Sequence, residues 1–461
     1  MDAIFDPEFV NELDSVISLQ ESVMSITNDN IDQIYNTILS IYQKSIQDQS
    51  PLKIHNDQAE FIKFISSTLL SVAHYRPTML TPLSQLAGKL FESFDGLKES
   101  LLHLPLKVQS TQWHIAFLYE CFVIGCINED DVFEILHYYK YHYSSMHGAI
   151  YLIFQYFHQV IRKKDPQFYE DSFNYLIKNK RRYDINVSSD FFKIRKNKIN
   201  DLNEIKEDEF EYDKDEEEKF NDTVRYWFPK GSIERIIRDD DFVAFKEMTT
   251  NNPEFKMNEI FSIKSIFCYS ELLKNHINFL SLAAFFGSSK IFTYLLEIGV
   301  NKNPLFDGNI SPIIRYAISG GNVEIIKQCE LDIDNETEIK HSIDASIEYF
   351  RFSLFQWIYD NKLENFQQFT QIQVINNQHL MVHPTISFLI TAAKVNNMKM
   401  LLFLLDNVDG SCDINQCDYY GWTPLHFAAK YRNIEAIKVI LNCKLLNLEP
   451  KSVRFFFYPF F

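Results

Sequence analysis

Three histidines recur at five-residue intervals, at His137, His142 and His147, and they are the first candidates for metal chemistry. A metal ion needs its ligands on one face of an element, whereas each step of five residues turns an α-helix by about 140°. The three imidazoles therefore point in different directions. We interpret them as ordinary polar positions of a helix.

Seven cysteines are scattered along the chain without a CxxC pair. Cys412 and Cys417 lack a second pair of ligands, so we predict buried, reduced thiols rather than a metal centre. The motifs GxGxxG, GxxxxGK[ST], HExxH and GxSxG are absent from the sequence. Because phosphate loops and the common hydrolase sites depend on these motifs, we predict no enzyme activity, no cofactor and no metal.

The formal net charge of the chain is −17. Nucleic acids and anionic membranes need a positive surface that displaces counterions from phosphate, so we predict neither as a partner. An acidic molecule suits a basic protein partner. The N-terminus is acidic where a secretory signal would be basic, and no apolar run is long enough to span a membrane, so we predict a cytoplasmic, monomeric protein.

Residues 1–199 show apolar residues at helical spacing with few helix breakers other than proline. We predict seven to nine helices arranged as antiparallel hairpins in this segment. No internal repeat is recognisable in it.

The charge pattern changes sharply after residue 199, because residues 201–222 hold twelve acidic side chains and three lysines. Such a run cannot bury enough apolar surface to fold alone, which predicts an exposed linker. Two basic clusters, residues 178–182 and 193–198, precede it. They either neutralise the acidic run in part or form a two-part nuclear import signal, which leaves a nuclear location as the alternative.

The sequence near the end of the chain predicts a helix hairpin, which begins with residues 418–429, DYYGWTPLHFAA. Gly421 permits a turn, Pro424 suits the first helical turn, and His426 can hydrogen-bond across the turn. Ala428 and Ala429 let neighbouring helices approach closely, and an apolar stripe follows up to residue 441. One such hairpin leaves an apolar face exposed, so copies must precede it.

Weaker copies do precede it. Gly287 and Gly321 are 34 residues apart, and Ala393 lies 36 residues before Ala429 in an equivalent position. Asn396 and Phe350 stand where these copies would have glycine. A repeat length of this size predicts a stack of about five to six helix hairpins held by contacts between neighbours.

The last unit closely resembles the ankyrin repeat, and residues 236–359 resemble a divergent ankyrin-type domain of unknown function that heads arrays in large protist families. The resemblance implies an all-α protein with a helical N-terminal domain followed by an ankyrin-repeat α-solenoid. We predict four segments. They are a helical domain of unknown role (1–199), an acidic linker (200–225), the divergent ankyrin-type domain (226–360) and C-terminal ankyrin repeats with an atypical aromatic tail (361–461).

The tail ends in seven aromatic and proline residues, FFFYPFF, which is not a polar capping repeat. It either folds back over the last helix pair, reflects a truncated reading frame, or forms a partner-binding or membrane-touching patch. We favour truncation or folding back.

In the ankyrin family the turn before the first helix of a repeat, and that helix itself, face the partner. The resemblance therefore assigns six residues to a partner-binding surface: Tyr419, Tyr420, Trp422, Phe427, Lys430 and Tyr431. Exposed Tyr and Trp are enriched among binding hot spots. The alternative is that these rings pack on the neighbouring turn at 413–415 or on the tail.

The sequence thus predicts a scaffold or adaptor that binds another protein and has no catalytic activity. Two alternatives stay open at this point. In one, the N-terminal helices carry an activity of their own and the repeats localise it. In the other, the chain is a structural or decaying family member without a specific partner.

Overall fold

The structure is a computed structural model of the chain, and its described part consists of the following residues: 5, 7–47, 58–103, 111–142, 147–178, 214–252, 254–263, 265, 267–274, 276–303, 305–306, 309–310, 312–329, 336–366, 384–407, 414–415, 417–418 and 421–447.

The chain divides into two compact units. One unit consists of residues 77–309, and the other combines residues 1–76 with residues 310–461. Both are helical, with two strands of two residues each, β1 (Leu305–Phe306) and β2 (Asn309–Ile310), in the described part. The prediction of an all-α helical-repeat fold is therefore confirmed. The two units cut across the four predicted segments, whose boundaries remain predictions.

The unit of residues 77–309 contains a short 3-10 helix, η1 (Pro77–Met79), and these α-helices: α4 (Leu80–Ser93), α5 (Leu97–Leu102), α6 (Thr111–Val123), α7 (Glu129–His142), α8 (His147–Lys164), α9 (Pro166–Lys178), α11 (Lys214–Tyr226), α12 (Ile233–Arg238), α13 (Phe242–Thr250), α14 (Glu271–Lys274), α15 (Phe279–Phe286) and α16 (Ser289–Glu297).

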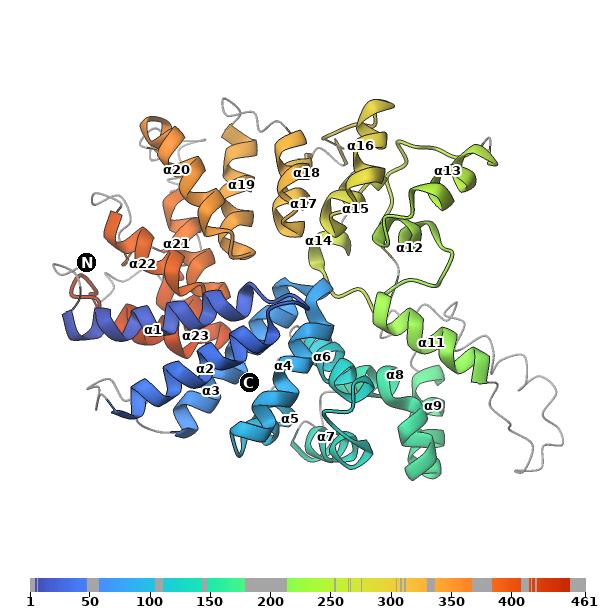
Figure 1. The fold of residues 1–461 in the computed structure, drawn as a ribbon, viewed down its shortest axis with the longest axis horizontal. Helices are drawn as coiled ribbons and strands as arrows, with labels where there is room; N and C mark the ends of the chain where they lie inside the picture. The colour runs from blue at the N-terminus through green and yellow to red at the C-terminus, as the bar shows by residue number, and fades with distance from the viewer. Residues whose placement is uncertain are drawn as a thin grey trace. The chain divides into compact units, whose positions relative to one another are not determined.

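Helices α4, α6 and α8 pack side by side (Figure 1). Helix α9 forms a hairpin with α8, and α7 packs on α5 and α8. Left-handed glycines open two of the turns, Gly96 with φ 87° and Gly125 with φ 84°. The prediction of seven to nine helices in residues 1–199 is confirmed by the nine α-helices of its described part, but α6 and α7 do not pack as a hairpin. The side-by-side packing of α4, α6 and α8 was missed, because these helices lack a shared small-residue signature and the sequence carries no periodic signal there.

The second half of the predicted acidic linker forms helix α11. Ion pairs connect this helix to α6 and to α12. The Arg225 guanidinium contacts the buried Glu120 carboxylate at 2.5 Å, and the Asp222 carboxylate accepts a 2.8 Å hydrogen bond from Arg235. Partners far away in the sequence thus supply the stability that the acidic composition alone cannot.

The unit that joins both ends of the chain contains α1 (Pro7–Met24), α2 (Ile31–Gln47), α3 (Gln58–Tyr75), α17 (Ile313–Gly320), α18 (Val323–Gln328), α19 (Glu336–Glu348), α20 (Phe352–Phe366), α21 (Pro384–Val395), α22 (Met398–Asn407), α23 (Pro424–Tyr431) and α24 (Ile434–Asn442).

Helices α17 to α24 are four successive hairpins whose first helices α17, α19, α21 and α23 pack on one another (Figure 1). In the other unit, α12 with α13 and α15 with α16 form two more stacked pairs. The described residues thus contain six such pairs, four stacked in one unit and two in the other, and the prediction of one array of five to six hairpins stays a prediction.

One residue in a left-handed conformation separates the two helices of each pair. These residues are Asp240 (φ 51°), Gly287 (75°), Gly321 (77°), Phe350 (58°), Asn396 (60°) and Arg432 (57°). Asn396 and Phe350 occupy the glycine place, as the sequence predicted. A bulky residue such as phenylalanine is strained there, so its neighbours must hold it. The Tyr75 ring does so from α3, with its centroid 5.8 Å from that of Phe350.

At four of these positions, the residue after the left-handed one bonds to the preceding pair. Ser288 donates to the Ile237 carbonyl oxygen at 2.5 Å, and Asn397 to that of Ile347 at 2.9 Å. Each acceptor lies three residues before the left-handed position of the preceding pair, where a helix end leaves carbonyls without an intrahelical partner.

The same bond recurs at two further junctions. Arg351 Nε donates to the Ile318 carbonyl at 3.1 Å, and Asn433 donates to the Ala393 carbonyl at 2.7 Å. These bonds fix the register in which consecutive hairpins stack.

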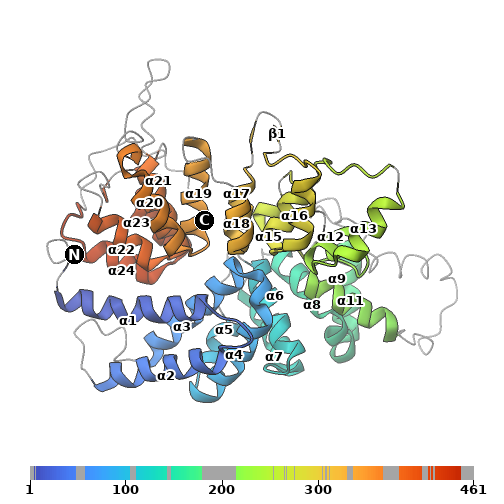
Figure 2. The ribbon, with the colours of Figure 1, turned by 45° about the horizontal axis from the view of Figure 1, so that its top comes forward.

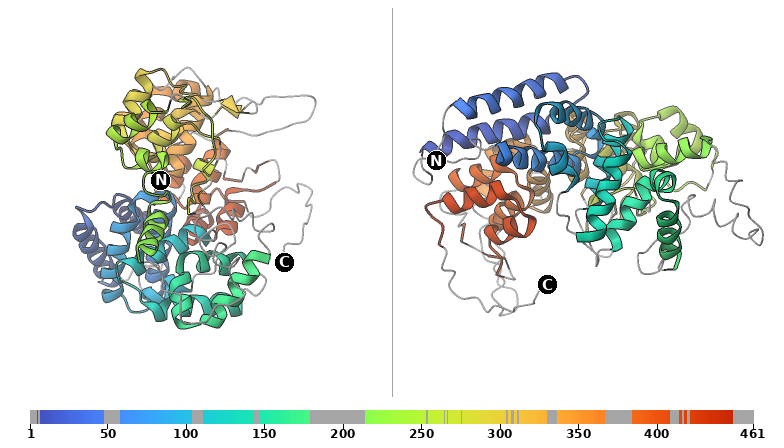
Figure 3. Two further views of the ribbon diagram at one scale, coloured as in Figure 1. Left: turned by 90° about the vertical axis from the view of Figure 1, so that its right-hand side faces the viewer. Right: turned by 90° about the horizontal axis from the view of Figure 1, so that it is seen from below.

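The N-terminal helices α1 and α3 pack against the C-terminal repeats. In Figures 2 and 3 the blue helix α1 lies beside the red helices α22 and α24, more than 370 residues later in the sequence. The buried Gln20 amide donates to the Asn396 carbonyl at 2.7 Å and accepts from the Met398 N–H at 3.2 Å. The prediction that neighbour contacts alone hold the array was therefore wrong.

Candidate protein-binding site

Four of the six predicted partner-binding residues lie in the described part of the chain, on α23 and just before it. Tyr419 and Tyr420 fall outside the described residues. The other four, Trp422, Phe427, Lys430 and Tyr431, form one cluster.

A tight turn positions Trp422. The Gly421 N–H and the Asp418 carbonyl oxygen are 2.9 Å apart, and the Asp418 carboxylate accepts the Trp422 N–H at 2.8 Å. Gly421 has φ 80°, a conformation that only glycine adopts without strain. The backbone that carries the indole ring is thus held by hydrogen bonds inside the turn.

The predicted role of His426 is confirmed. Its Nδ1 atom accepts the Thr423 N–H at 3.1 Å and lies 2.8 Å from the Thr423 hydroxyl. The imidazole therefore closes the start of α23, which leaves one fewer backbone donor unpaired at the helix end. This structural task explains the residue without any catalytic role.

The Lys430 ammonium lies at the centre of the cluster. It is 4.7 Å from the centroid of the Trp422 ring, 6.0 Å from that of Phe427 and 5.9 Å from that of Tyr431. The Trp422 and Phe427 rings are themselves 5.5 Å apart. Cation–π attraction at these distances holds the lysine over the rings.

The cluster faces solvent. Lys430 is exposed, Tyr431 is 39% exposed, and Trp422 and Phe427 are half-buried. The rings of Trp422 and Phe427 pack on each other and on Lys430, so part of their surface is covered by the cluster itself. The described contacts of these rings are with one another and with Lys430 rather than with the turn at 413–415, and their role in binding stays a prediction.

Lys394 on α21 was missed as a site residue. Its ammonium lies 5.6 Å from the centroid of the Tyr431 ring, on which Lys430 also converges. A sequence signal existed, since Ala393-Lys394 occupies the place in its repeat that Ala429-Lys430 occupies in the last one. We call Trp422, Phe427, Lys430, Tyr431 and Lys394 the lysine–aromatic surface.

The end of α3 lies behind this surface. Desolvation, followed by the charge of Lys394, lowers the pKa of His74 to about 4, so this imidazole is neutral at pH 7. Burial raises the pKa of Tyr75 well above its usual value, with the nearby Tyr431 a minor cause. The His74 and Tyr75 side chains are therefore uncharged at pH 7, and the two lysines are the charged residues of the surface itself.

The neighbouring helices α17 and α19 carry two basic and four acidic residues. Arg315 faces Glu348 at 3.7 Å. Burial raises the pKa of Asp344 to about 6, and its Oδ1 atom is buried without a hydrogen-bond partner. These groups form a polar seam between helices rather than a free charged face.

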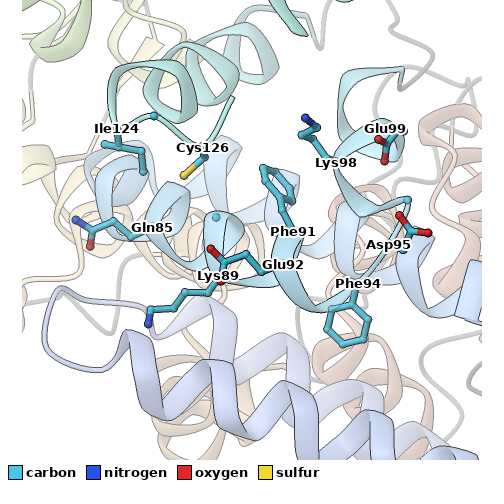
Figure 4. A pocket seen from close by; sticks show the side chains of 13 residues that line it. Gln85, Lys89, Phe91, Glu92, Phe94, Asp95, Lys98, Glu99, Ile124 and Cys126 are labelled. Carbon is cyan, nitrogen blue, oxygen red and sulfur yellow. The ribbon is translucent and has the colours of Figure 1, made fainter. Parts of the chain in front are cut away.

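A separate cavity of about 590 Å³ lies in the other unit, between α4, α5 and the turn after α6. Figure 4 shows Cys126 at one side, with Lys89, Glu92 and Lys98 among the side chains around it. Burial raises the pKa of the Cys126 thiol, which keeps it protonated and a weak nucleophile. The lining contains no histidine, and its residues form no catalytic arrangement that we recognise.

The described residues contain no group of three His, Cys, Asp or Glu side chains able to hold a metal ion. His137 is exposed on α7, where it bonds to the Phe133 carbonyl, and His147 begins α8. Cys417 is a free thiol, and Cys412 lies outside the described residues. Among the helices that the structure describes, none is long and apolar enough to cross a membrane.

Stacked pairs of short antiparallel helices with a left-handed residue between them define a helical-repeat protein. Residues 354–451 match the family model described as ankyrin repeats (3 copies). A putative ankyrin repeat protein of Rickettsia bellii is 53% identical over 32 residues, which are 7% of this chain and 33% of that protein. This protein therefore carries ankyrin repeats.

Among solved structures, the human ASB11 ankyrin repeat domain is similar to 45% of this chain, over 81% of its own length. The sequence identity is 15% and the TM-score 0.27. The predicted divergent ankyrin-type domain at 236–359 lies mostly before the matched residues 354–451 and stays a prediction.

Proposed function

We propose that this protein is a non-catalytic scaffold or adaptor that binds another protein through the lysine–aromatic surface. Ankyrin repeats generally mediate protein–protein interactions and are typically not catalytic. The observation that carries the proposal is the convergence of Trp422, Phe427 and Tyr431 on one exposed lysine at the first helix of a repeat.

The physical argument rests on desolvation. Aromatic side chains that are half-exposed in the free protein release water when a partner covers them, and each can contribute about 2 kcal/mol or more to binding. Their mutual packing reduces the rotamer entropy that binding must remove. Tyr419 and Tyr420, which adjoin Trp422 in the sequence, extend the proposed surface.

The test is affinity capture followed by mass spectrometry with the full chain and its Trp422→Ala variant. Trp357→Ala is the matched control, because Trp357 is 49% exposed on α20, the second helix of another pair. We expect a captured protein to fall by at least about tenfold with Trp422→Ala and to stay unchanged with Trp357→Ala.

Thermal unfolding of both variants separates binding from folding. The proposal fails if Trp422→Ala lowers the melting temperature by several degrees and leaves the captured proteins unchanged. In that case the indole ring serves only the packing of the last repeat.

A further inference from the structure

We propose that the lysine–aromatic surface recognises an acidic segment of its partner, in which carboxylate side chains alternate with apolar ones. This inference rests on the proposed function and specifies the chemistry of the ligand. It departs from the basic partner that the net charge of −17 predicts.

The first step is the local charge. The first helices of the last two pairs, α21 and α23, contain two lysines, one histidine and no acidic residue. The chain as a whole has 62 acidic against 45 basic residues. At contact distance a partner responds to the nearby charges, because a surface charge more than about 10 Å away is largely screened at ordinary salt.

The second step is that Lys394 and Lys430 form no salt bridge within the described part of the chain, whereas Lys399 and Lys438 in the same unit pair with Glu21 and Glu60. Two carboxylates beside α23 make hydrogen bonds to other groups. Asp418 accepts the Trp422 N–H, and the buried Glu435 accepts a hydrogen bond from Asn396 at 2.8 Å. The charge of Lys394 acts on the carboxyl of Asp344 in α19, but the two side chains form no ion pair.

The third step is geometric. Both ammoniums lie within 6 Å of the centroid of the Tyr431 ring, at 5.6 Å and 5.9 Å. The ring restrains both lysine side chains before a ligand binds. Binding a carboxylate therefore costs less lysine side-chain entropy than it would if the lysines moved freely. The flanking Trp422 and Phe427 rings offer apolar contact to the residues between the carboxylates. Binding a nucleic acid would need a broader basic surface, which α17 and α19 do not supply, because they contain more acidic than basic residues.

The test uses three labelled peptides and fluorescence anisotropy with the full chain. One peptide alternates glutamate with leucine and phenylalanine, the second replaces each glutamate by glutamine, and the third replaces each by lysine. A labelled oligouridine of similar length is the fourth probe. The protein variant is Lys394→Gln with Lys430→Gln.

The matched control is Lys290→Gln with Lys327→Gln, two exposed lysines on α16 and α18. Both double variants change the net charge equally, so they differ only in where the charge is removed. We expect the glutamate peptide to bind at least about tenfold more weakly to Lys394→Gln/Lys430→Gln and within about twofold of wild type to the control.

Tighter binding of the glutamine or lysine peptide than of the glutamate peptide overturns the inference. So does an equal loss in both double variants, which would mean long-range charge alone, or binding of oligouridine as tightly as the glutamate peptide. If the proteins captured in the Trp422 experiment are lost with Trp422→Ala but kept with Lys394→Gln/Lys430→Gln, the proposed function stands and the acidic ligand does not.

Discussion

The left-handed residues between paired helices show how a single residue fits both its own backbone and the neighbouring repeat. Gly321 has φ 77°, and a Cβ atom there would overlap the Arg351 guanidinium. That guanidinium donates to the Ile318 and Ser319 carbonyls, both at 3.1 Å. Gly321 therefore serves the turn and leaves room for the next pair's donor.

We expect Gly321→Ala to destabilise the protein by about 3 kcal/mol. About 1 kcal/mol comes from the left-handed backbone, and the rest from Arg351 leaving carbonyls unpaired as it moves aside. Gly299→Ala is the control, since Gly299 has φ 80° and nothing lies within 4 Å of the added carbon. Urea unfolding followed by circular dichroism gives both values, and equal losses would contradict the proposed clash.

Pairs of helices are the units that stack, and at four junctions the donor after the left-handed residue fixes their register. Asn433 shows this most cleanly. Its side-chain N–H donates to the Ala393 and Lys394 carbonyls, both at 2.7 Å, and it makes no side-chain cap on α24. The side chain therefore acts only across the junction between two hairpins.

Asn433→Asp should cost about 2 to 3 kcal/mol of unfolding free energy, because a carboxylate of the same shape faces two carbonyl oxygens and cannot donate. Asn442→Asp serves as the comparison. Its amide is exposed and bonds within α24 to the Lys438 carbonyl, so we expect a loss of about 0.5 kcal/mol. Similar losses in the two variants, measured by urea unfolding, would rule out a special role for the junction bond.

At the scale of the whole molecule, the first and last parts of the sequence fold together. Gln20 is 2% exposed, and its amide binds both sides of the α21–α22 turn across separations of 376 and 378 residues. Lys444 Nζ adds a 3.2 Å hydrogen bond to the Phe5 carbonyl. A repeat array normally gains its stability from contacts between neighbouring repeats. In this protein α1 also contacts the turn between α21 and α22 and adds to that stability.

We expect Gln20→Ala to lower the unfolding free energy by about 2 kcal/mol and to speed amide hydrogen exchange in α22, because a buried carbonyl and a buried N–H lose their partner. Glu21→Ala is the neighbouring control. It removes only the exposed ion pair with Lys399, which is expected to contribute less than about 1 kcal/mol. Unchanged exchange in α22 of the Gln20 variant would refute the bracing role.

The sequence by itself determined the local features of this protein. Turn residues, helical spacing and small residues act within one hairpin, so the run from Gly421 to Ala429 identified the last repeat and gave His426 its role. Asn396 and Phe350 could be placed for the same reason, because a left-handed turn is imposed on one residue at a fixed distance from its helices.

The tertiary structure decided what depends on contacts between distant residues. The sequences of α1 and α3 do not indicate that these helices pack on the C-terminal turns. The spacing of apolar residues shows which face of a helix is buried but not which element covers that face. The place of Lys394 in the lysine–aromatic surface, which we propose as a binding surface, depends on such contacts too. The Lys394 ammonium lies over the Tyr431 ring only because α21 and α23 pack side by side. The two residues are 37 positions apart in the sequence.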